Sequence, residues 1–359
     1  MKLAIILGTR PEIIKFCSII RYCEKNKLNY FIIHTNQHYS ENMDKIFFEE
    51  LKLSQPKYNL NIGSGSHGKQ TGLMLEKIEE VLIKEKPDVV LVEGDTNTAF
   101  AGALAAAKLR IKVGHVEAGL RSYDRSMPEE INRVMVDHVS DYLFAPTENQ
   151  KKILFGEGIA NEKIFVTGNT IVDAVIQNDE LSEKKDYLSL YGLTKNNYFL
   201  ITAHRAENTD KKEILRNILK SFENMYKRYK IKLFCPIHPR TKKMIEEYEL
   251  AVPKGLILHE PVGYLKFLQL IKNAKIILTD SGGVQEEACI LKVPCVTLRE
   301  NTERPETIEV GANIIAGTNP ANIVECIEKM LNAKRDWKNP FGEGKAEEKI
   351  IKAILNQKF

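Results

Sequence analysis

Several features that define whole classes of protein are scarce in this chain of 359 residues. Its six cysteines form no C-x-x-C pair and have no histidine framework beside them, so they indicate buried, reduced thiols in a cytoplasmic protein and no metal site. No apolar run approaches the ~20 residues of a membrane span. Residues 1–12 have an apolar core of about five residues, which is too short for a secretory signal and indicates a first strand. Lysine and arginine number 52 against 48 aspartates and glutamates, with no dense basic block, which argues against nucleic-acid binding.

Short β-forming runs alternate instead with helix-length amphipathic stretches along the whole chain. Runs that are apolar on both faces and separated by helices indicate parallel strands in doubly wound α/β layers. The expected strands are 3–7, 30–34, 89–93, 112–116, 142–145, 163–167, 198–202, 232–237, 256–259, 275–279, 294–298 and 313–316.

The same pattern occurs twice, and the chain is too long for one hydrophobic core. The charge-rich segment 179–195 separates the two halves. We therefore predict an N-terminal Rossmann-like domain at 1–170 and a C-terminal one at 171–359. Two such domains are expected to face each other across a cleft, the natural place for a ligand.

In the first half, polar residues follow the strands directly. Thr9 and Glu12 have the spacing of a capping box, but this does not explain why Arg10 and Lys15 lie near the positive end of a helix. A bound phosphate would remove that conflict.

Three carboxylates in this half are candidates for proton transfer. Asp95 follows the third strand, where it has the alternative role of a helix cap. Glu117 follows the fourth strand and enters a glycine turn, where no capping role is available to it. Glu129 has the alternative of a capping box with Ser126, supported by Arg133 four residues later.

In the second half, the most informative stretch is 275–306. A buried strand runs into Ser281, Gly282 and Gly283 and then into helix-forming residues, which predicts free N–H groups aimed at an anion such as phosphate. Glu287, four residues past the second glycine, is placed to reach sugar hydroxyls. His204 and His238 each end a strand, and each is as consistent with a structural role as with a functional one.

These motifs together closely resemble those of the non-hydrolysing UDP-N-acetylglucosamine 2-epimerases. They occur in the family's order across nearly the full chain: GTRPEIIK (8–15), GDTNT (94–98), GHVEAGLRS (114–122), PEEINR (128–133), TGNT (167–170), AHRAEN (203–208), TDSGGVQEEA (279–288) and TERPE (302–306).

The resemblance implies the glycosyltransferase-B-like fold and reversible epimerisation at C2 between UDP-N-acetylglucosamine (UDP-GlcNAc) and UDP-N-acetylmannosamine (UDP-ManNAc). It implies elimination and re-addition of UDP through a glycal, no metal or nicotinamide cofactor, and a homodimer. The catalytic residues that it implies are Asp95, Glu117, Glu129 and His204. The substrate-binding residues that it implies are Arg10, Lys15, Phe267, Ser281, Gly282, Gly283, Glu287 and Arg304. Phe267, by residue type alone, is as typical of a core.

The chain also departs from the family's pattern. Many relatives have Gln-His-Arg after the second strand, where a second UDP-GlcNAc acts as activator, whereas residues 37–39 here are Gln-His-Tyr. Any activator site would use Gln37, Arg205 and His238.

Four alternative functions share these motifs. An epimerase for a modified UDP-2,3-diacetamido sugar has the same requirements. A glycosyltransferase of the same fold does not need three carboxylates in the N-terminal half. A hydrolysing epimerase would release UDP, and a nucleotide-sugar sensor would bind without turnover.

Overall fold

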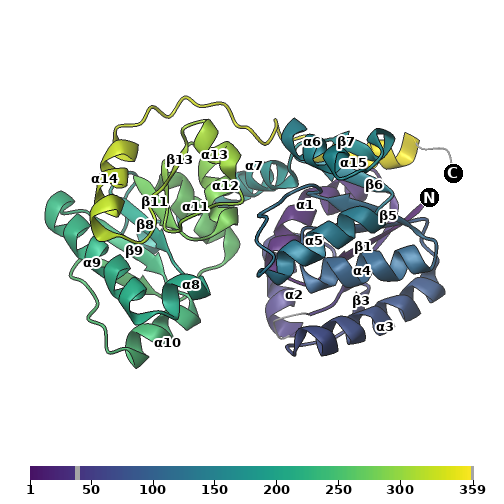
Figure 1. The fold of residues 1–359 in the computed structure, drawn as a ribbon, viewed down its shortest axis with the longest axis horizontal. Coiled ribbons are helices and arrows are strands. Elements are labelled where there is room, and N and C mark those ends of the chain that lie inside the picture. Colours follow the sequence, from purple (N-terminus) through teal and green to yellow (C-terminus); the bar gives the residue numbers. More distant parts are fainter. Residues whose placement is uncertain (37–40, 357–359) are drawn as a thin grey trace. The chain divides into compact units, whose positions relative to one another are not determined.

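The computed structural model describes residues 1–36 and 41–356, which form two compact units. Unit 1 comprises Met1–Gln177 together with Phe341–Phe359, and unit 2 comprises Asn178–Pro340. Each unit is a parallel sheet with helices on both faces (Figure 1). In the part of the chain that the structure describes, no helix is long and apolar enough to cross a membrane.

The sheet of unit 1 has the strand order β3-β2-β1-β4-β5-β6-β7. Its strands are β1 (Lys2–Leu7), β2 (Asn29–His34), β3 (Tyr58–Asn59), β4 (Val89–Glu93), β5 (Lys112–Val116), β6 (Tyr142–Ala145) and β7 (Ile164–Val166). Its helices are α1 (Arg10–Lys25), α2 (Glu41–Glu50), α3 (His67–Glu85), α4 (Asn97–Lys108), α5 (Pro128–Val139), α6 (Glu148–Gly156) and α15 (Ala346–Asn356). The helix α7 (Thr170–Ser182) begins in unit 1 and ends in unit 2. The six apolar runs predicted in this half are all strands, and the prediction missed the two-residue edge strand β3.

Small side chains let α4 pack close to the centre of this sheet. Its sequence, NTAFAGALAAAK, is rich in alanine, and a Cβ added at Gly102 would lie 3.1 Å from side-chain atoms of Ile6 and Val92. The helices α3, α4 and α5 cover this face of the sheet (Figure 1), where their apolar residues form one core cluster with alternate residues of β1 and β4. The turns at the start of α4 are thereby fixed against the strands that carry the predicted carboxylates.

The sheet of unit 2 has the order β10-β9-β8-β11-β12-β13. Its strands are β8 (Tyr198–Thr202), β9 (Lys232–Pro236), β10 (Leu256–His259), β11 (Ile276–Thr279), β12 (Cys295–Thr297) and β13 (Asn313–Ile315). Its helices are α8 (Ala206–Thr209), α9 (Lys212–Tyr229), α10 (Pro239–Glu247), α11 (Tyr264–Asn273), α12 (Gly282–Ile290), α13 (Pro305–Glu309) and α14 (Pro320–Leu331). Alternate strand residues pack on α9 and α14 on one face and on α11 and α12 on the other.

The C-terminal segment returns to unit 1, whereas the predicted boundary assigns all residues after 170 to one domain. The N–H of Asn169 donates to the carbonyl of Phe341 at 2.8 Å, and the N–H of Ala346 donates to Asp173 Oδ1 at 2.9 Å. Gly168, with φ of +88°, lets this segment approach, because a Cβ there would lie 3.1 Å from the Phe341 carbonyl. Figure 1 shows α15 in yellow among the teal helices of unit 1.

Both sheets reverse their strand order at the centre, as in Rossmann folds. The reversal falls between β1 and β4 in unit 1 and between β8 and β11 in unit 2. Ligands of such sheets bind at the carboxyl ends of the strands on either side of this point. A ligand-binding site is therefore expected among the residues that follow β1, β4, β8 and β11.

Candidate active site

The turn after β1 is closed around the carboxylate of Glu12. The N–H of Gly8 and the hydroxyl of Thr9 donate to its Oε2 at 3.0 and 2.8 Å, and the hydroxyl of Thr96, after β4, donates to its Oε1 at 2.8 Å. A Cβ at Gly8 would lie 2.0 Å from the hydroxyl of Thr35, so glycine is required. The predicted capping box forms only in part, because Thr9 donates to Glu12 and does not accept from the helix.

This enclosed carboxyl group makes the free energy of unfolding depend on pH. Burial raises the pKa of Glu12 to about 7 from 4.5, against the opposing hydrogen bonds from Thr9, Thr96 and Gly8. The folded state therefore binds this proton more tightly than the unfolded state, which stabilises the fold at low pH. The contribution is lost as pH rises from about 4.5 to 7.

Replacing Glu12 with glutamine is expected to remove this dependence. A shift of about 2.5 units, at about 1.4 kcal/mol per unit, amounts to about 3 kcal/mol. The glutamine oxygen can accept from Gly8 and Thr9 while its amide donates to Thr96. Urea unfolding at pH 5 and pH 8 should show the wild type losing about 2–3 kcal/mol more than Glu12→Gln over this interval. Parallel losses in the two proteins would contradict the assignment.

A cavity of about 410 Å³ in unit 1 brings together two of the predicted carboxylates, Asp95 and Glu129. Its lining residues are Thr9, Ser64, Gly65, His67, Gln70, Asp95, Thr96, Asn97, Pro128, Glu129 and Asn132. Asp95 comes from the turn after β4, and Glu129 from the first turn of α5. The cavity thus lies at the strand-order reversal and holds two groups able to exchange protons.

Amides that the sequence did not single out hold the Asp95 turn in place. The Asn132 side-chain amide donates to the carbonyl of Asp95 at 3.0 Å and to Asn97 Oδ1 at 3.1 Å. Asn97 in turn donates to Gln70 Oε1 at 2.9 Å and contacts His67 Nδ1 at 3.3 Å. Asn97 and Asn132 lie inside the quoted motifs at 94–98 and 128–133, which was the available signal.

The capping box at the start of α5, which was the alternative role for Glu129, does not form. The N-cap is Met127, without a side-chain cap, so the third helical residue is Glu130 and not Glu129. Glu130 is buried and accepts from the N–H groups of residues 122 and 123 and, at 2.9 Å, from Arg133 Nη1. Arg133 also pairs with Asp95, which therefore has an ion-pair partner and is not a helix cap; Thr96 caps α4. Glu129 is left exposed to the cavity.

Glu117, the third predicted carboxylate, lies in a separate buried cluster. Its backbone has φ of +68°, an uncommon conformation for a residue with a side chain. Its carboxylate contacts the ammonium of Lys15, which also lies 3.0 Å from Glu93 Oε1. Lys15 is thus occupied by carboxylates in this structure, and its role in phosphate binding stays a prediction. Arg10 lies with its guanidinium 5.5 Å from the centre of the Phe47 ring.

A buried histidine on β5 links this strand to α5 and to the turn after β4. His115 Nδ1 lies 2.7 Å from Asp137 Oδ1, and its Nε2 lies 2.9 Å from the carbonyl of Gly94. Asp137 also pairs with Arg121 at 2.7 Å. Asp137 also accepts from the N–H of Gly119 at 3.3 Å, so α5 is linked both to β5 and to the turn that carries Glu117.

In unit 2, the buried carboxylate of Asp280 organises the turn after β8. It accepts from the N–H groups of His204 and Arg205 at 2.8 and 2.9 Å and from Asn208 Nδ2 at 3.0 Å. His204 Nδ1 lies 3.2 Å from its other oxygen. Burial opposes ionisation, but these hydrogen bonds and the His204 ring outweigh it and lower the pKa of Asp280. Asp280 lies within the motif at 279–288, but its residue type alone did not indicate this role.

Two of the three predicted activator residues lie near this turn. His238 caps α10 by accepting from the N–H of Arg240 at 3.1 Å, and its ring centre lies 5.5 Å from that of His204. Burial and the charges of His204 and Arg240 lower the pKa of His238. Arg205 is the N-cap residue of α8. Gln37 lies outside the described residues.

The predicted phosphate turn is a helix start, as expected. Ser281 is the N-cap residue of α12, and its side chain makes no cap hydrogen bond. Gly282 and Gly283 form the first turn of this helix; Gly282 is buried, whereas a Cβ at Gly283 would meet no atom within 4 Å. Farther along α12, Glu287 is buried.

Arg304 and Phe267, which were predicted to contact the nucleotide, both contact other protein side chains in this structure. Arg304 Nε lies 2.8 Å from Glu286 Oε1. Phe267 is half-buried on α11 and packs against a core cluster. Their contacts with nucleotide remain predictions.

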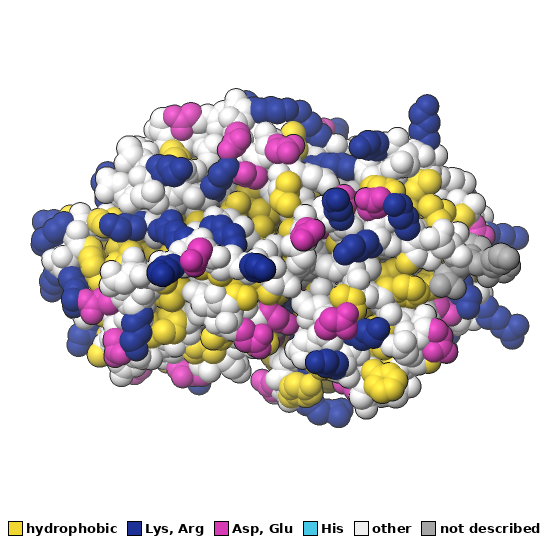
Figure 2. All heavy atoms as spheres, turned by 90° about the horizontal axis from the view of Figure 1, so that it is seen from above, with side chains coloured by type: hydrophobic (Ala, Val, Ile, Leu, Met, Phe, Trp, Pro, Cys, Tyr) yellow, Lys and Arg dark blue, Asp and Glu magenta, His cyan; other side chains and the backbone are white. Residues whose placement is uncertain are grey.

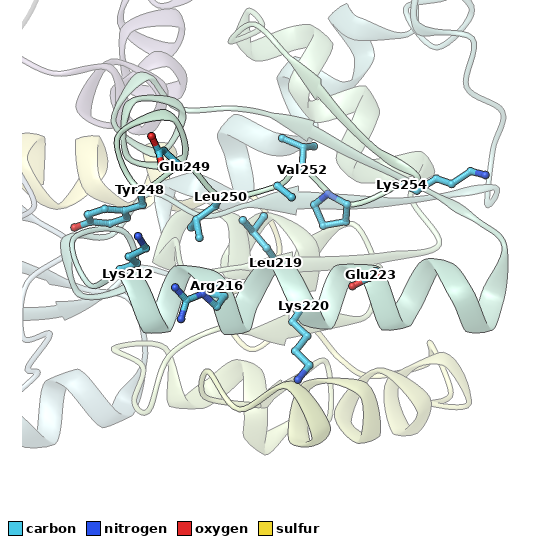
Figure 3. Close-up of a pocket in the computed structure, with 12 residues that line it drawn as sticks. Lys212, Arg216, Leu219, Lys220, Glu223, Tyr248, Glu249, Leu250, Val252 and Lys254 are labelled. Carbon is cyan, nitrogen blue, oxygen red and sulfur yellow. The ribbon is translucent and has the colours of Figure 1, made fainter.

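A larger hollow of about 610 Å³ in unit 2 contains none of the predicted residues. It lies between α9 and residues 248–254, where Figure 3 shows Lys212, Arg216 and Leu219 on the helix and Tyr248 and Leu250 across from them.

Charges of both signs are spread over the face drawn in Figure 2, with lysines and arginines interspersed among aspartates and glutamates. Residues 1–36 and 41–356 contain no group of three or more histidines, cysteines and carboxylates arranged to hold a metal. All six cysteines are buried thiols outside any disulfide, as predicted.

Two doubly wound parallel sheets with polar groups at their strand-order reversals define an α/β enzyme of the glycosyltransferase-B-like class. The family model for UDP-N-acetylglucosamine 2-epimerase matches residues 21–355. The chain is 61% identical over 366 residues to the UDP-N-acetylglucosamine 2-epimerase of Methanocaldococcus jannaschii, covering 100% of both chains. The chain therefore belongs to the UDP-N-acetylglucosamine 2-epimerase family, whose members are isomerases, as the motifs predicted.

Solved structures and a second relative refine the comparison. A crystal structure of the M. jannaschii enzyme in complex with UDP-GlcNAc and UDP matches with a TM-score of 0.93 over 99% of this chain and 100% of that one, at 61% identity. The UDP-2,3-diacetamido-2,3-dideoxy-D-glucuronate 2-epimerase of Pseudomonas aeruginosa is 41% identical over 357 residues, covering 99% of both chains.

Proposed function

We propose that the protein reversibly converts UDP-GlcNAc to UDP-ManNAc by epimerisation at C2, without net hydrolysis. The observation that carries the proposal is the full-length 61% identity with a 2-epimerase whose crystal structure holds UDP-GlcNAc and UDP. The cavity shared by Asp95 and Glu129 supports it, because the reaction requires groups that remove and return a proton.

The reaction that we propose proceeds by elimination and re-addition. The C2 hydrogen is not next to a carbonyl, so it becomes acidic only as the bond from C1 to UDP weakens. A carboxylate takes the C2 proton, the C1–O electron pair leaves with UDP, and a C1=C2 double bond remains in the glycal. UDP then adds back at C1 while C2 takes a proton from the opposite face.

We assign proton transfer and stabilisation of the leaving group to separate sets of residues. The carboxylates of Asp95, Glu117 and Glu129 in unit 1 serve proton transfer. In unit 2, His204 and the N-terminus of α12 stabilise the departing pyrophosphate electrostatically.

The closest competing function is epimerisation of a UDP-2,3-diacetamido sugar. The 41% identity with the P. aeruginosa enzyme over 99% of the chain supports this sugar as the second candidate substrate. The 61% identity with the UDP-GlcNAc enzyme supports the unmodified sugar as the substrate.

Proton NMR of the purified protein with UDP-GlcNAc in deuterated water tests the proposal directly. We expect a UDP-ManNAc anomeric signal, deuterium at C2, and little free UDP. Unchanged UDP-GlcNAc together with turnover of the diacetamido sugar would transfer the assignment to the second substrate. Stoichiometric release of UDP and free ManNAc would instead identify a hydrolysing enzyme.

A further inference from the structure

Two buried carboxyl groups in unit 1 converge on a single ammonium group. Lys15 Nζ, from α1, lies 3.0 Å from Glu93 Oε1, at the end of β4, and contacts Glu117 Oε2 in the turn after β5. The side chains of Glu93 and Glu117 are each 3% exposed, and that of Lys15 is 11% exposed. Solvent therefore screens the interactions among the three charges only weakly.

The charges in this cluster balance only if one carboxyl group keeps a proton. Two ionised carboxylates and one ammonium would leave a net negative charge in a buried place, which is costly. Two carboxyl groups that share one site respond by separating their proton affinities. Burial raises the pKa of Glu93 well above its ordinary value, Lys15 opposes this, and the charges of Glu117 and of Glu12 add to it.

We propose that Glu93 keeps its proton at neutral pH and donates a hydrogen bond to the Glu117 carboxylate. Glu93 is thereby a positioning residue for Glu117. Glu117 is then the single anion paired with Lys15, and it is held from two sides. The effect on catalysis rests on the proposed function, in which Glu117 takes part in proton transfer.

The proton itself can be observed without any substrate. A protonated carboxyl has a carbonyl stretching band in the infrared that a carboxylate lacks. At pH 8.5, where Glu12 with its pKa of about 7 is ionised, we expect this band in the wild type and in Glu12→Gln, and its loss in Glu93→Gln. Absence of the band from the wild type, or its survival in Glu93→Gln, would overturn the proposal.

Kinetics of two substitutions separate positioning from simple packing. Glu93→Ala removes the donor, and we expect kcat to fall about 10- to 100-fold with KM little changed. Glutamine has the shape and the donor of a protonated glutamate, so Glu93→Gln should recover most of that loss. If Glu93 were instead the anionic partner of Lys15, glutamine would do no better than alanine, and that result would refute the proposal.

The two experiments also keep this inference apart from the proposed function. The infrared band is measured on the protein alone, so it reports the shared proton whether or not UDP-GlcNAc is the substrate. A band lost only in Glu93→Gln, from a protein that epimerises no UDP-sugar, would uphold the proton assignment and refute the epimerase.

Discussion

Replacing Glu129 with glutamine is expected to lower kcat for epimerisation about 100-fold or more and to leave the free energy of unfolding unchanged. The side chain is exposed to the cavity that also holds Asp95, and the pairing with Arg133 that the sequence suggested does not form. Glutamine keeps the shape but carries no exchangeable carboxyl proton, and general acid–base catalysis contributes about 10²–10⁴ in rate. The measurement is kcat by coupled assay or NMR, beside urea unfolding.

The neighbouring glutamate provides the matched control. Glu130 accepts four hydrogen bonds, from Ser122 N–H and hydroxyl, from Tyr123 N–H and from Arg133. In Glu130→Gln one oxygen becomes an amide that faces donors, which should cost about 2–4 kcal/mol of stability. A Glu129→Gln variant that keeps wild-type kcat would remove Glu129 from the reaction, whatever Glu130→Gln does.

The strands could be predicted from the sequence because their cause is local. The central runs, which form β1, β4, β8 and β11, are apolar on both faces and almost wholly buried, so composition identifies them. The edge strand β3 pairs only at Tyr58 and Asn59, and two residues provide no pattern. The return of α15 to unit 1 depends on which surface accepts an amphipathic helix, and periodicity does not contain that information.

The candidate site could be predicted in its residue types but not in its pairings. The motifs identified Asp95, Glu117 and Glu129, yet a shift of one residue in the start of α5 gives Arg133 a different partner. Lys15 meets Glu117 across 102 residues of sequence, which no spacing rule covers. Such pairings arise only when three strand ends are brought to one edge of the sheet.

Asp280 is expected to give the largest loss of stability in unit 2. Its carboxylate accepts two backbone N–H groups and the Asn208 amide, and it is fully buried. Asp280→Ala leaves these donors without an acceptor and should lower the free energy of unfolding by about 3–5 kcal/mol. Asp210→Ala is the control, because its pair with Arg240 is exposed to solvent and should contribute little to stability.

The aspartate-to-asparagine change separates this structural role from ligand binding. In Asp280→Asn the oxygen can still accept the three donors, so most of the stability should remain. The new amide N–H, however, faces His204 Nδ1 across the 3.2 Å contact, and the carboxylate that would favour a protonated ring is gone. If His204 stabilises the pyrophosphate as proposed, the Kd for UDP should rise about tenfold, or about 1.4 kcal/mol, by isothermal titration calorimetry. An unchanged Kd in a stable Asp280→Asn protein would show that the pairing of His204 with the Asp280 carboxylate plays no part in holding UDP.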